Sequence, residues 1–217
     1  MRKQLFLTGF ILLFVSIGFA QFEGSKQVYS SPKLKDEISK HKTVAILPFE
    51  VSITYKRIPK HYDSSANKNE EKSLTKSLQQ SMYTYLLRKS SKYFVSFQDV
   101  DRTNALLKSK GLIDKLDEIT SDSLCKLLGV DAVIKSRYAY EKTASEAGAI
   151  VTSILLRSAA LGGKTGSGSL TMQIYNGTSG DLLWRFYKAM DDNLFSSSDQ
   201  LMERMMRKVA RNFPYEK

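Results

Sequence analysis

The run from Thr43 to Phe49 constrains the fold of this chain more than any other part of its sequence. From Val44 to Leu47 every residue is apolar. A strand with one wet face would alternate apolar and polar residues, so this run predicts a strand buried in the middle of a sheet and covered on both sides. Pro48 closes the strand. The later alternation of Val51, Ile53 and Tyr55 predicts an extension.

Helical and strand periodicities alternate after this run. From Glu70 to Leu86 apolar residues recur at intervals of three and four, which predicts a helix of about five turns. A strand is predicted at Tyr93–Val100, followed by two short helices that end at Gly111 and Gly129. The next strand, Asp131–Glu141, begins apolar and then alternates, so one of its faces is expected to be wet.

A β-hairpin and a helix complete the chain. Leu170–Tyr175 alternates, residues 176–181 have turn composition, and Leu182–Ala189 returns as the second strand with Trp184. The last helix carries an apolar, methionine-rich stripe from Leu201 to Phe213, which is typical of core packing. These elements predict an α/β fold, a layered domain with a mixed β-sheet flanked by helices, ending in a β-hairpin and a C-terminal helix.

Other segments lack the pattern of a core element. Residues 56–69 contain almost no apolar side chain and predict a solvated loop. Residues 162–169 are rich in glycine and serine and predict a flexible loop. Residues 21–42 are polar and interrupted by breakers, and we interpret them as an N-terminal arm that leads into the domain.

The amino terminus predicts export. Arg2 and Lys3 precede an apolar run from Leu5 to Ala20, with small residues at Gly18 and Ala20 ahead of a cleavage site. The run is shorter than the about 20 apolar residues that a membrane span needs, which favours a cleaved signal peptide over a retained anchor. We therefore divide the chain into a signal peptide (1–20), an arm (21–42) and a single α/β domain (43–217), in the periplasm or associated with the outer membrane.

The charge of the chain bears on its partners. The formal net charge is +11, and removing residues 1–20, which hold two basic residues and no acidic ones, leaves +9. For an exported chain this balance is compatible with an anionic envelope surface as a partner, but its lysines and arginines are dispersed rather than clustered, which favours an ordinary solvated surface. The sequence has no finger, no basic recognition helix and no aromatic platform, so no nucleic-acid partner is predicted.

The sequence offers little catalytic chemistry. A single cysteine, Cys125, excludes an intrachain disulfide. It lies beside a leucine face, which predicts a buried free thiol. His61 and Asp63 would supply two metal ligands without a third nearby, and the glycines around Lys164 match no phosphate-binding loop. We therefore predict no catalytic residue, no metal and no cofactor, and a chain that is not an enzyme.

Three motifs resemble a family of envelope proteins. They are Val44–Phe49, Leu127–Ile134 and Gly180–Trp184. In these motifs the chain resembles the envelope family that includes the curli-secretion channel and the penicillin-binding-protein activator lipoproteins, with a fold similar to the amino-terminal domain of the Tol translocation protein. The resemblance spans about residues 43–213 and implies that fold and an envelope address. The motif residues for which we expect structural roles are Pro48, Phe49, Gly129, Asp131 and Trp184.

Each expected role has a physical reason. Gly129 permits the left-handed turn that ends a helix, Asp131 lets the chain turn into a strand, and Trp184 supplies a large buried surface beneath the sheet. Many members of the family are lipoproteins with an acylated cysteine at the mature start. This chain has Ala20 and Gln21 there, which argues against a lipid tether.

Channel members of the family insert strand hairpins into a membrane, and residues 144–161 lie where such an insertion could be placed. Their apolar residues recur at helical spacing, which favours a helix that packs on the sheet. An assembly or membrane element is the alternative, although a membrane strand needs about 9 to 11 residues of outward apolar alternation. The residues that would distinguish the two are Ile150, Val151, Ile154 and Leu155.

Three functional hypotheses follow. The preferred one is an exported, non-catalytic accessory or scaffolding module that binds other envelope proteins. The second is a subunit of an oligomeric outer-membrane secretion or assembly complex, in which the chain would form a homo-oligomer. The third is an envelope enzyme without a recognisable motif.

Overall fold

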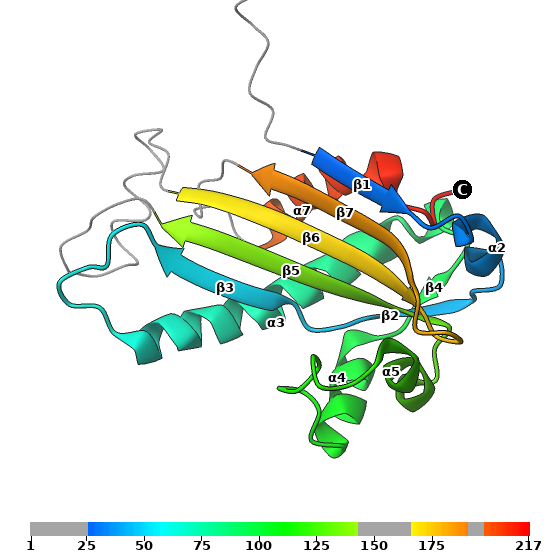
Figure 1. The fold of residues 1–217 in the computed structure, drawn as a ribbon, viewed down its shortest axis with the longest axis horizontal. Coiled ribbons are helices and arrows are strands. Elements are labelled where there is room, and N and C mark those ends of the chain that lie inside the picture. The colour runs from blue at the N-terminus through cyan, green and yellow to red at the C-terminus, as the bar shows by residue number, and fades with distance from the viewer. Residues whose placement is uncertain (1–25, 143–165, 191–197) are drawn as a thin grey trace, which may run out of the picture.

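The computed structural model describes residues 26–142, 166–190 and 198–217, which form one seven-stranded mixed sheet with helices (Figure 1). The strands are β1 (Lys26–Ser30), β2 (Thr43–Ile46), β3 (Glu50–Tyr55), β4 (Ser96–Phe97), β5 (Ala132–Lys142), β6 (Gly166–Asn176) and β7 (Leu182–Met190). The helices are α2 (Leu34–Ile38), α3 (Ser64–Arg88), α4 (Val100–Ser109), α5 (Ser121–Leu128) and α7 (Ser198–Val209), with short 3-10 helices at Ser90–Lys92 and Ala210–Asn212. This architecture confirms the predicted fold class.

The sheet is ordered β1-β7-β6-β5-β2-β4, with β3 also paired to β5. β5 is antiparallel to β6 and parallel to both β2 and β3. The predicted strand (β2) and its extension (β3) therefore both pair with β5. The strand is interrupted between Ile46 and Glu50, where Pro48 lies. Proline cannot donate a ladder hydrogen bond, which explains the interruption at this place.

Helices cover the two faces of the sheet unequally. Figure 1 shows α3 and α7 behind the sheet, where they enclose the larger hydrophobic core. α4 and α5 pack on the other face only near β2 and the start of β5. Val44 and Ile46 belong to the larger core, and Ala45 and Leu47 belong to the smaller one. The central strand is thus buried on both sides, as its sequence predicts.

The long helix α3 begins earlier than predicted. It begins at Ser64, because the Asp63 carboxylate accepts hydrogen bonds from the amides of Ser65 (2.8 Å) and Ala66 (3.3 Å). Residues 64–69 are therefore helical, and the prediction of a loop up to residue 69 is wrong there. Asn67 is buried against β3, so a polar residue that reads as loop in the sequence has a packing role.

The segment that we interpreted as an N-terminal arm contains regular structure from Lys26 onward. From Lys26 onward this segment belongs to the sheet, because β1 pairs antiparallel with β7 over its whole length. α2 follows and buries Ile38 in the larger core. All five residues of β1 are exposed, so its position is set by main-chain pairing rather than by an apolar pattern.

Two strand boundaries differ as well. The strand predicted at Tyr93–Val100 shortens to β4, whose two residues pair with β2 only. β6 begins at Gly166, inside the predicted flexible loop, because its first residues continue the ladder with β5. The predicted hairpin is confirmed, and so is the final helix, whose buried residues are Leu201, Met202, Met205, Met206 and Val209.

No helix in the described ranges combines the length and the apolar composition needed to cross a bilayer. The predicted signal peptide (1–20) lies outside the described residues. The segment 144–161, with Ile150, Val151, Ile154 and Leu155, lies outside them too.

Candidate functional site

The face of the sheet opposite α3 and α7 is not covered by a described helix beyond α4 and α5. Side chains alternate between the faces along each strand, and the pairing registers bring those of five strands together on this side. All of them are exposed or half-buried. We call this surface the open face and define it by Gln27, Tyr29, Glu50, Ser52, Lys135, Arg137, Ala139, Thr171, Gln173, Arg185 and Tyr187.

The registers arrange the open face in rows across the strands. One row runs through Glu50, Arg137, Thr171, Tyr187 and Gln27. Arg137 Nη2 lies 3.2 Å from Glu50 Oε1, with both side chains more than half exposed. An ion pair so exposed contributes little to stability, so both charges remain available to a partner.

The next row combines aromatic and basic side chains. It runs through Lys135, Gln173, Arg185 and Tyr29. Lys135 Nζ lies 5.4 Å from the centre of the Tyr175 ring, and Gln173 Nε2 donates to the Tyr175 hydroxyl at 3.0 Å. Burial lowers the pKa of Lys135. Tyrosine and arginine are side chains that protein interfaces favour.

A shallow hollow lies at the β1 end of the open face. Its volume is about 430 Å³. Val28 and Tyr29 are among its lining residues and are 41% and 49% exposed. The full lining is Gln27, Val28, Tyr29, Leu182, Arg185 and Tyr187, which combines aromatic and aliphatic surface with one cation.

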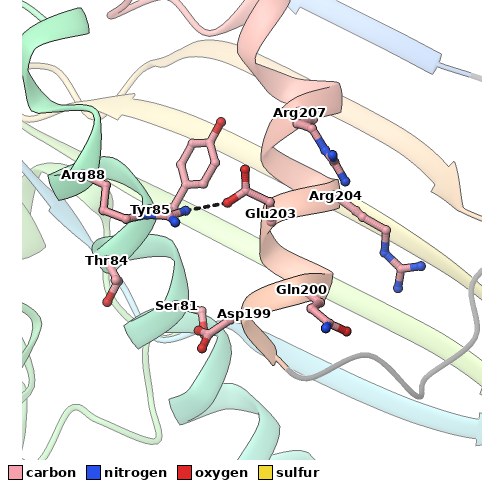
Figure 2. A pocket seen from close by; sticks show the side chains of 9 residues that line it. All are labelled: Ser81, Thr84, Tyr85, Arg88, Asp199, Gln200, Glu203, Arg204 and Arg207. Atoms are coloured by element: carbon pink, nitrogen blue, oxygen red, sulfur yellow. Dashed lines mark hydrogen bonds and ion pairs between the residues drawn. The ribbon is translucent and has the colours of Figure 1, made fainter.

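A second concavity is the groove between α3 and α7, shown in Figure 2. Its volume is about 510 Å³. An ion pair between Arg88 and Glu203 bridges the two helices, and Ser81 Oγ donates to Asp199 Oδ1 at 2.6 Å. The other lining residues are Thr84, Tyr85, Gln200, Arg204 and Arg207.

The groove contains no recognisable catalytic set. A hydroxyl nucleophile needs a base that is itself oriented by a third group, and neither histidine nor cysteine lines the groove. Both of its carboxylates already have partners in Ser81 and Arg88. The polar groups therefore join α3 to α7 rather than form a reaction centre.

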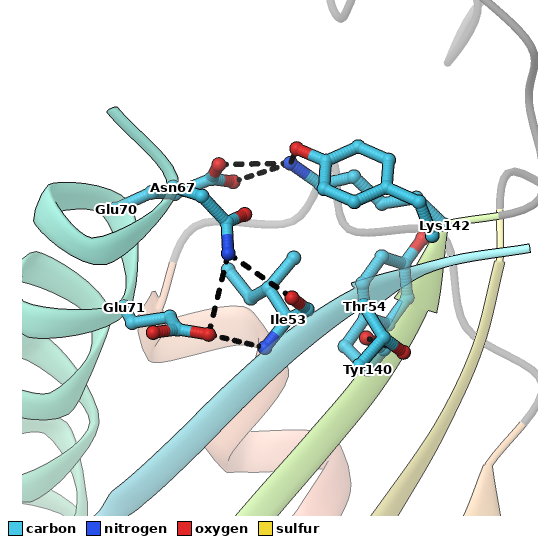
Figure 3. Close-up of polar contacts among 8 residues, drawn as sticks. Ile53, Thr54, Asn67, Glu70, Glu71, Tyr140 and Lys142 are labelled. Atoms are coloured by element: carbon cyan, nitrogen blue, oxygen red, sulfur yellow. Dashed lines mark hydrogen bonds and ion pairs between the residues drawn. The ribbon is translucent and has the colours of Figure 1, made fainter. Parts of the chain in front are cut away.

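Figure 3 shows a third polar cluster, where α3 meets β3 and β5. Lys142 Nζ donates to the two carboxylate oxygens of Glu70 at 2.9 and 2.8 Å. Burial lowers the pKa of Lys142, but the hydrogen bond and charge of Glu70, together with Tyr55, outweigh burial and raise this pKa above its ordinary value. The lysine is therefore charged and held by its partner.

In the same cluster α3 binds the main chain of β3. The Glu71 carboxylate accepts from the Ile53 amide at 2.8 Å, and the Asn67 side-chain amide donates to the Ile53 carbonyl at 3.1 Å (Figure 3). Both main-chain groups of Ile53 are thus satisfied by side chains. No sequence pattern predicts this cluster, because Asn67 lies in the predicted loop and Glu70 and Glu71 are polar residues at the start of the predicted helix.

Two of the predicted structural residues lie where α5 passes into β5. Gly129 ends α5 with φ +66°, in the left-handed region. One carboxylate oxygen of Asp131 accepts from the amides of Lys42 (2.7 Å) and Thr43 (2.8 Å), and its carbonyl accepts from the Gly177 amide at 2.7 Å. Asp131 therefore connects the start of β2, the start of β5 and the β6–β7 turn.

The electrostatics of Asp131 agree with this position. Burial raises the pKa of its carboxyl, but the hydrogen bonds from the Thr43 and Lys42 amides, helped by the His41 charge, outweigh burial and lower this pKa below its ordinary value. These hydrogen bonds favour the deprotonated carboxylate, which accepts them from both amides, over the protonated carboxyl group.

Of the other predicted structural residues, Trp184 and Phe49 lie in the larger core. Trp184 is 1% exposed, with its ring stacked on Phe186 and edge-on to Phe213 at centroid distances of 6.0 and 6.1 Å. Phe49 is buried and Pro48 is half-buried. Neither the hollow nor the groove includes any of the five predicted motif residues in its lining.

Buried titratable groups give no sign of reactivity. Burial raises the pKa of the Cys125 thiol to about 12, so it stays protonated. His41 Nδ1 lies 2.8 Å from the Tyr215 hydroxyl, and burial lowers the pKa of His41 and raises that of Tyr215. Asp63 caps α3, and no group of three metal-binding side chains occurs within the described ranges.

No protein-family model matches this sequence, and no curated protein matches it. Several solved structures are similar in fold at low identity. The lipoprotein GNA1162 from Neisseria meningitidis is 11% identical, with 78% of this chain and 96% of that chain covered and a TM-score of 0.44. A PelC dodecamer from Paraburkholderia phytofirmans is 13% identical, with coverages of 89% and 97% and a TM-score of 0.41. The LpoB C-terminal domain from Salmonella enterica is 10% identical, with coverages of 73% and 96% and a TM-score of 0.35.

Proposed function

We propose that this chain is an exported, non-catalytic accessory or scaffolding module of the cell envelope, which binds other envelope proteins through its open face. The main support for this proposal is the open face itself, where tyrosine, arginine, lysine and hydroxyl side chains of five strands form a broad surface. Protein interfaces are enriched in tyrosine and arginine, which combine apolar area with hydrogen bonding. The predicted signal peptide supports the envelope location.

The polar clusters support a binding role over a catalytic one. Lys142 is held by Glu70, Asp131 by two amides, and the carboxylates of the α3–α7 groove by Ser81 and Arg88. A catalytic group needs a perturbed pKa together with access to a substrate, and these side chains instead join elements of the fold.

Fractionation and cross-linking of the native protein test the proposal. We expect the tagged mature chain in the envelope fraction, cross-linked to a defined envelope protein. Tyr187→Ser and Arg137→Glu on the open face should abolish this cross-link. Arg102→Glu on α4 and Tyr62→Ser in the β3–α3 loop are the matched controls, and both should keep it.

Other results would contradict the proposal. A chain that stays in the cytoplasm would remove the envelope role, and cross-linking insensitive to both open-face variants would remove the open face as the binding surface. A large homo-oligomer in the outer-membrane fraction would instead favour the secretion or assembly complex.

A further inference from the structure

The edge strands of the sheet differ in how far their main-chain groups are accessible to another strand. At one edge, Glu71 and Asn67 bind the amide and the carbonyl of Ile53 and so block strand pairing at this residue of β3 (Figure 3). Beyond β2, the edge strand β4 has only two residues. On the other side β1 has five residues, all exposed, and it pairs with β7 alone among the described strands.

The alternation of an antiparallel ladder determines which groups of β1 face outward. The amide of Ser31 donates to the Leu183 carbonyl at 2.8 Å, and the same register aligns Tyr29 with Arg185 and Gln27 with Tyr187. Residues that exchange hydrogen bonds with a neighbour alternate with residues whose main-chain groups point away. The amides and carbonyls of Val28 and its alternate neighbours Lys26 and Ser30 therefore point to the free side of β1.

We infer that this free edge of β1 is a strand-addition site that takes an extended, acidic segment of a partner protein. The inference rests on the proposed binding function and assigns it a surface and a class of ligand. An added strand would obtain its affinity from the main-chain groups of β1 and its specificity from alternate side chains. Open edges are normally blocked because they invite pairing, so one blocked and one open edge in the same sheet point to a use for the open one.

Charge selects an acidic segment over a second copy of this chain. Lys26 is the charged residue of β1 and is exposed, Lys33 and Lys35 follow the strand in the turn and in α2 and are exposed too, and Arg185 lines the hollow. The chain as a whole carries +11, or +9 without residues 1–20, so two copies would repel each other. An acidic strand would instead meet complementary charge along the edge.

The hollow adds a place for one side chain of the incoming strand. Strands lie about 4.8 Å apart, and side chains of an added strand on the open-face side would stand beside Gln27 and Tyr29. There they reach the aromatic and aliphatic lining that Tyr29, Tyr187 and Leu182 provide. The preferred ligand is therefore a strand that alternates acidic with apolar residues.

Binding of labelled peptides to the mature protein tests the inference. The probe is a short peptide that alternates glutamate and valine, and the matched control alternates lysine and valine. We expect fluorescence anisotropy to show binding of the glutamate peptide and at least about tenfold weaker binding of the lysine peptide, because charge complementarity favours the former. Equal binding of both peptides, or binding of neither, would overturn the inference.

A proline substitution tests the main-chain pairing. Val28→Pro removes an amide that points away from β7, so the domain should keep its melting temperature while the glutamate peptide binds about tenfold more weakly. Tyr29→Pro removes an amide that faces β7 and should instead destabilise the β1–β7 pairing. If Val28→Pro does not fold, a glutamate peptide methylated on its main-chain nitrogens gives the same test, and undiminished binding of that peptide would refute strand addition.

The cross-linking experiment separates this inference from the proposed function. An envelope protein that cross-links equally to wild type and to Val28→Pro would leave the binding function intact and remove β1 as its site. Loss of every envelope partner from the wild-type chain would remove the proposed function whatever the peptides show. A concentration-dependent dimer that Val28→Pro abolishes would reject the acidic segment in favour of a second copy.

Discussion

Trp184 and Asp131 show how single residues stabilise the described domain in different ways. Trp184 is 1% exposed and stabilises the core by burying its apolar surface against Phe186 and Phe213. Asp131 lies at the start of β5 and acts through hydrogen bonds to the main chain of β2. The first contribution is independent of pH and the second depends on the charge of a carboxylate.

We expect Trp184→Ala to lower the free energy of unfolding by about 3 to 5 kcal/mol, the range for removing a large buried aromatic side chain. Arg185→Ala on the same strand is the control and should stay within about 0.5 kcal/mol of wild type, because its side chain is exposed. Denaturant titration measures both. A Trp184→Ala midpoint equal to that of wild type would show that the side chain does not belong to the core.

Asp131→Ala should lower the free energy of unfolding by about 1 to 3 kcal/mol at neutral pH, because it leaves the Lys42 and Thr43 amides without their carboxylate. The pKa of Asp131 is lower in the folded state than the value of about 3.9 in an unfolded chain. Below that value the unfolded chain binds the proton more readily, so the contribution is lost as pH falls through the folded-state pKa.

Unfolding measured from pH 7 to pH 2.5 checks this linkage. The stability difference between wild type and Asp131→Ala should shrink as the pH falls below about 3.9. The exposed Asp114→Ala should show no comparable difference at neutral pH. A difference that is constant over the whole range would mean that the charge of Asp131 has no part in its role.

At the scale of elements, the connections determine where helices and strands begin. α5 ends at Gly129, and the turn between β6 and β7 approaches β5 at Gly177. The two glycines are required for different reasons. At Gly129 an added Cβ meets no atom within 4 Å but φ is +66°, whereas at Gly177 it would lie 2.5 Å from the Asp131 carbonyl oxygen.

Alanine substitutions separate these two reasons. Gly129→Ala should cost about 1 to 2 kcal/mol, which is the cost of a left-handed backbone for an L-residue. Gly177→Ala should cost up to about 3 kcal/mol and shift the β6–β7 turn, because the methyl group meets rigid main-chain atoms. Thermal unfolding and hydrogen exchange at the Gly177 amide report both effects. A Gly177→Ala variant as stable as wild type, with unchanged exchange, would contradict the close approach.

At the scale of the molecule, the described residues form a sheet with one face packed on α3 and α7 and one open face, with an edge partly blocked at β3 and a free edge at β1. This asymmetry locates the proposed binding surface and the proposed strand-addition site side by side. Both depend on export of the chain, because their expected partners are envelope proteins.

We expect the exported protein to begin at Gln21, after a signal peptide with small residues at Gly18 and Ala20. Mass spectrometry of the purified envelope-located chain measures its first residue. As a control, Ala20→Arg should block cleavage and leave a longer form. An intact chain that begins at Met1 in the membrane fraction would show a retained anchor instead.

The sequence by itself predicts the order of the described elements from β2 onward and the burial of the central strand. The apolar run of β2, the stripe of α7 and the β6–β7 hairpin each carry a local period that reports burial directly, and the structure confirms them. The solvent-facing side of β5 is also predicted by the sequence, because Lys135, Arg137 and Glu141 alternate with positions that the structure shows to be buried, Ser136, Tyr138 and Tyr140. These features depend on neighbours that are close in the chain.

The sheet edges and the rows of the open face, by contrast, depend on contacts between residues that are distant in the sequence. β1 has no apolar period, so its place beside β7 follows from main-chain hydrogen bonds to residues that lie 154 to 162 positions later in the chain. The early start of α3 has the same cause, since Asn67 and Glu71 are polar in sequence yet bind Ile53 across the gap between helix and strand. Pairing and edge protection join residues that are distant in the chain, and a local period carries no information about such partners.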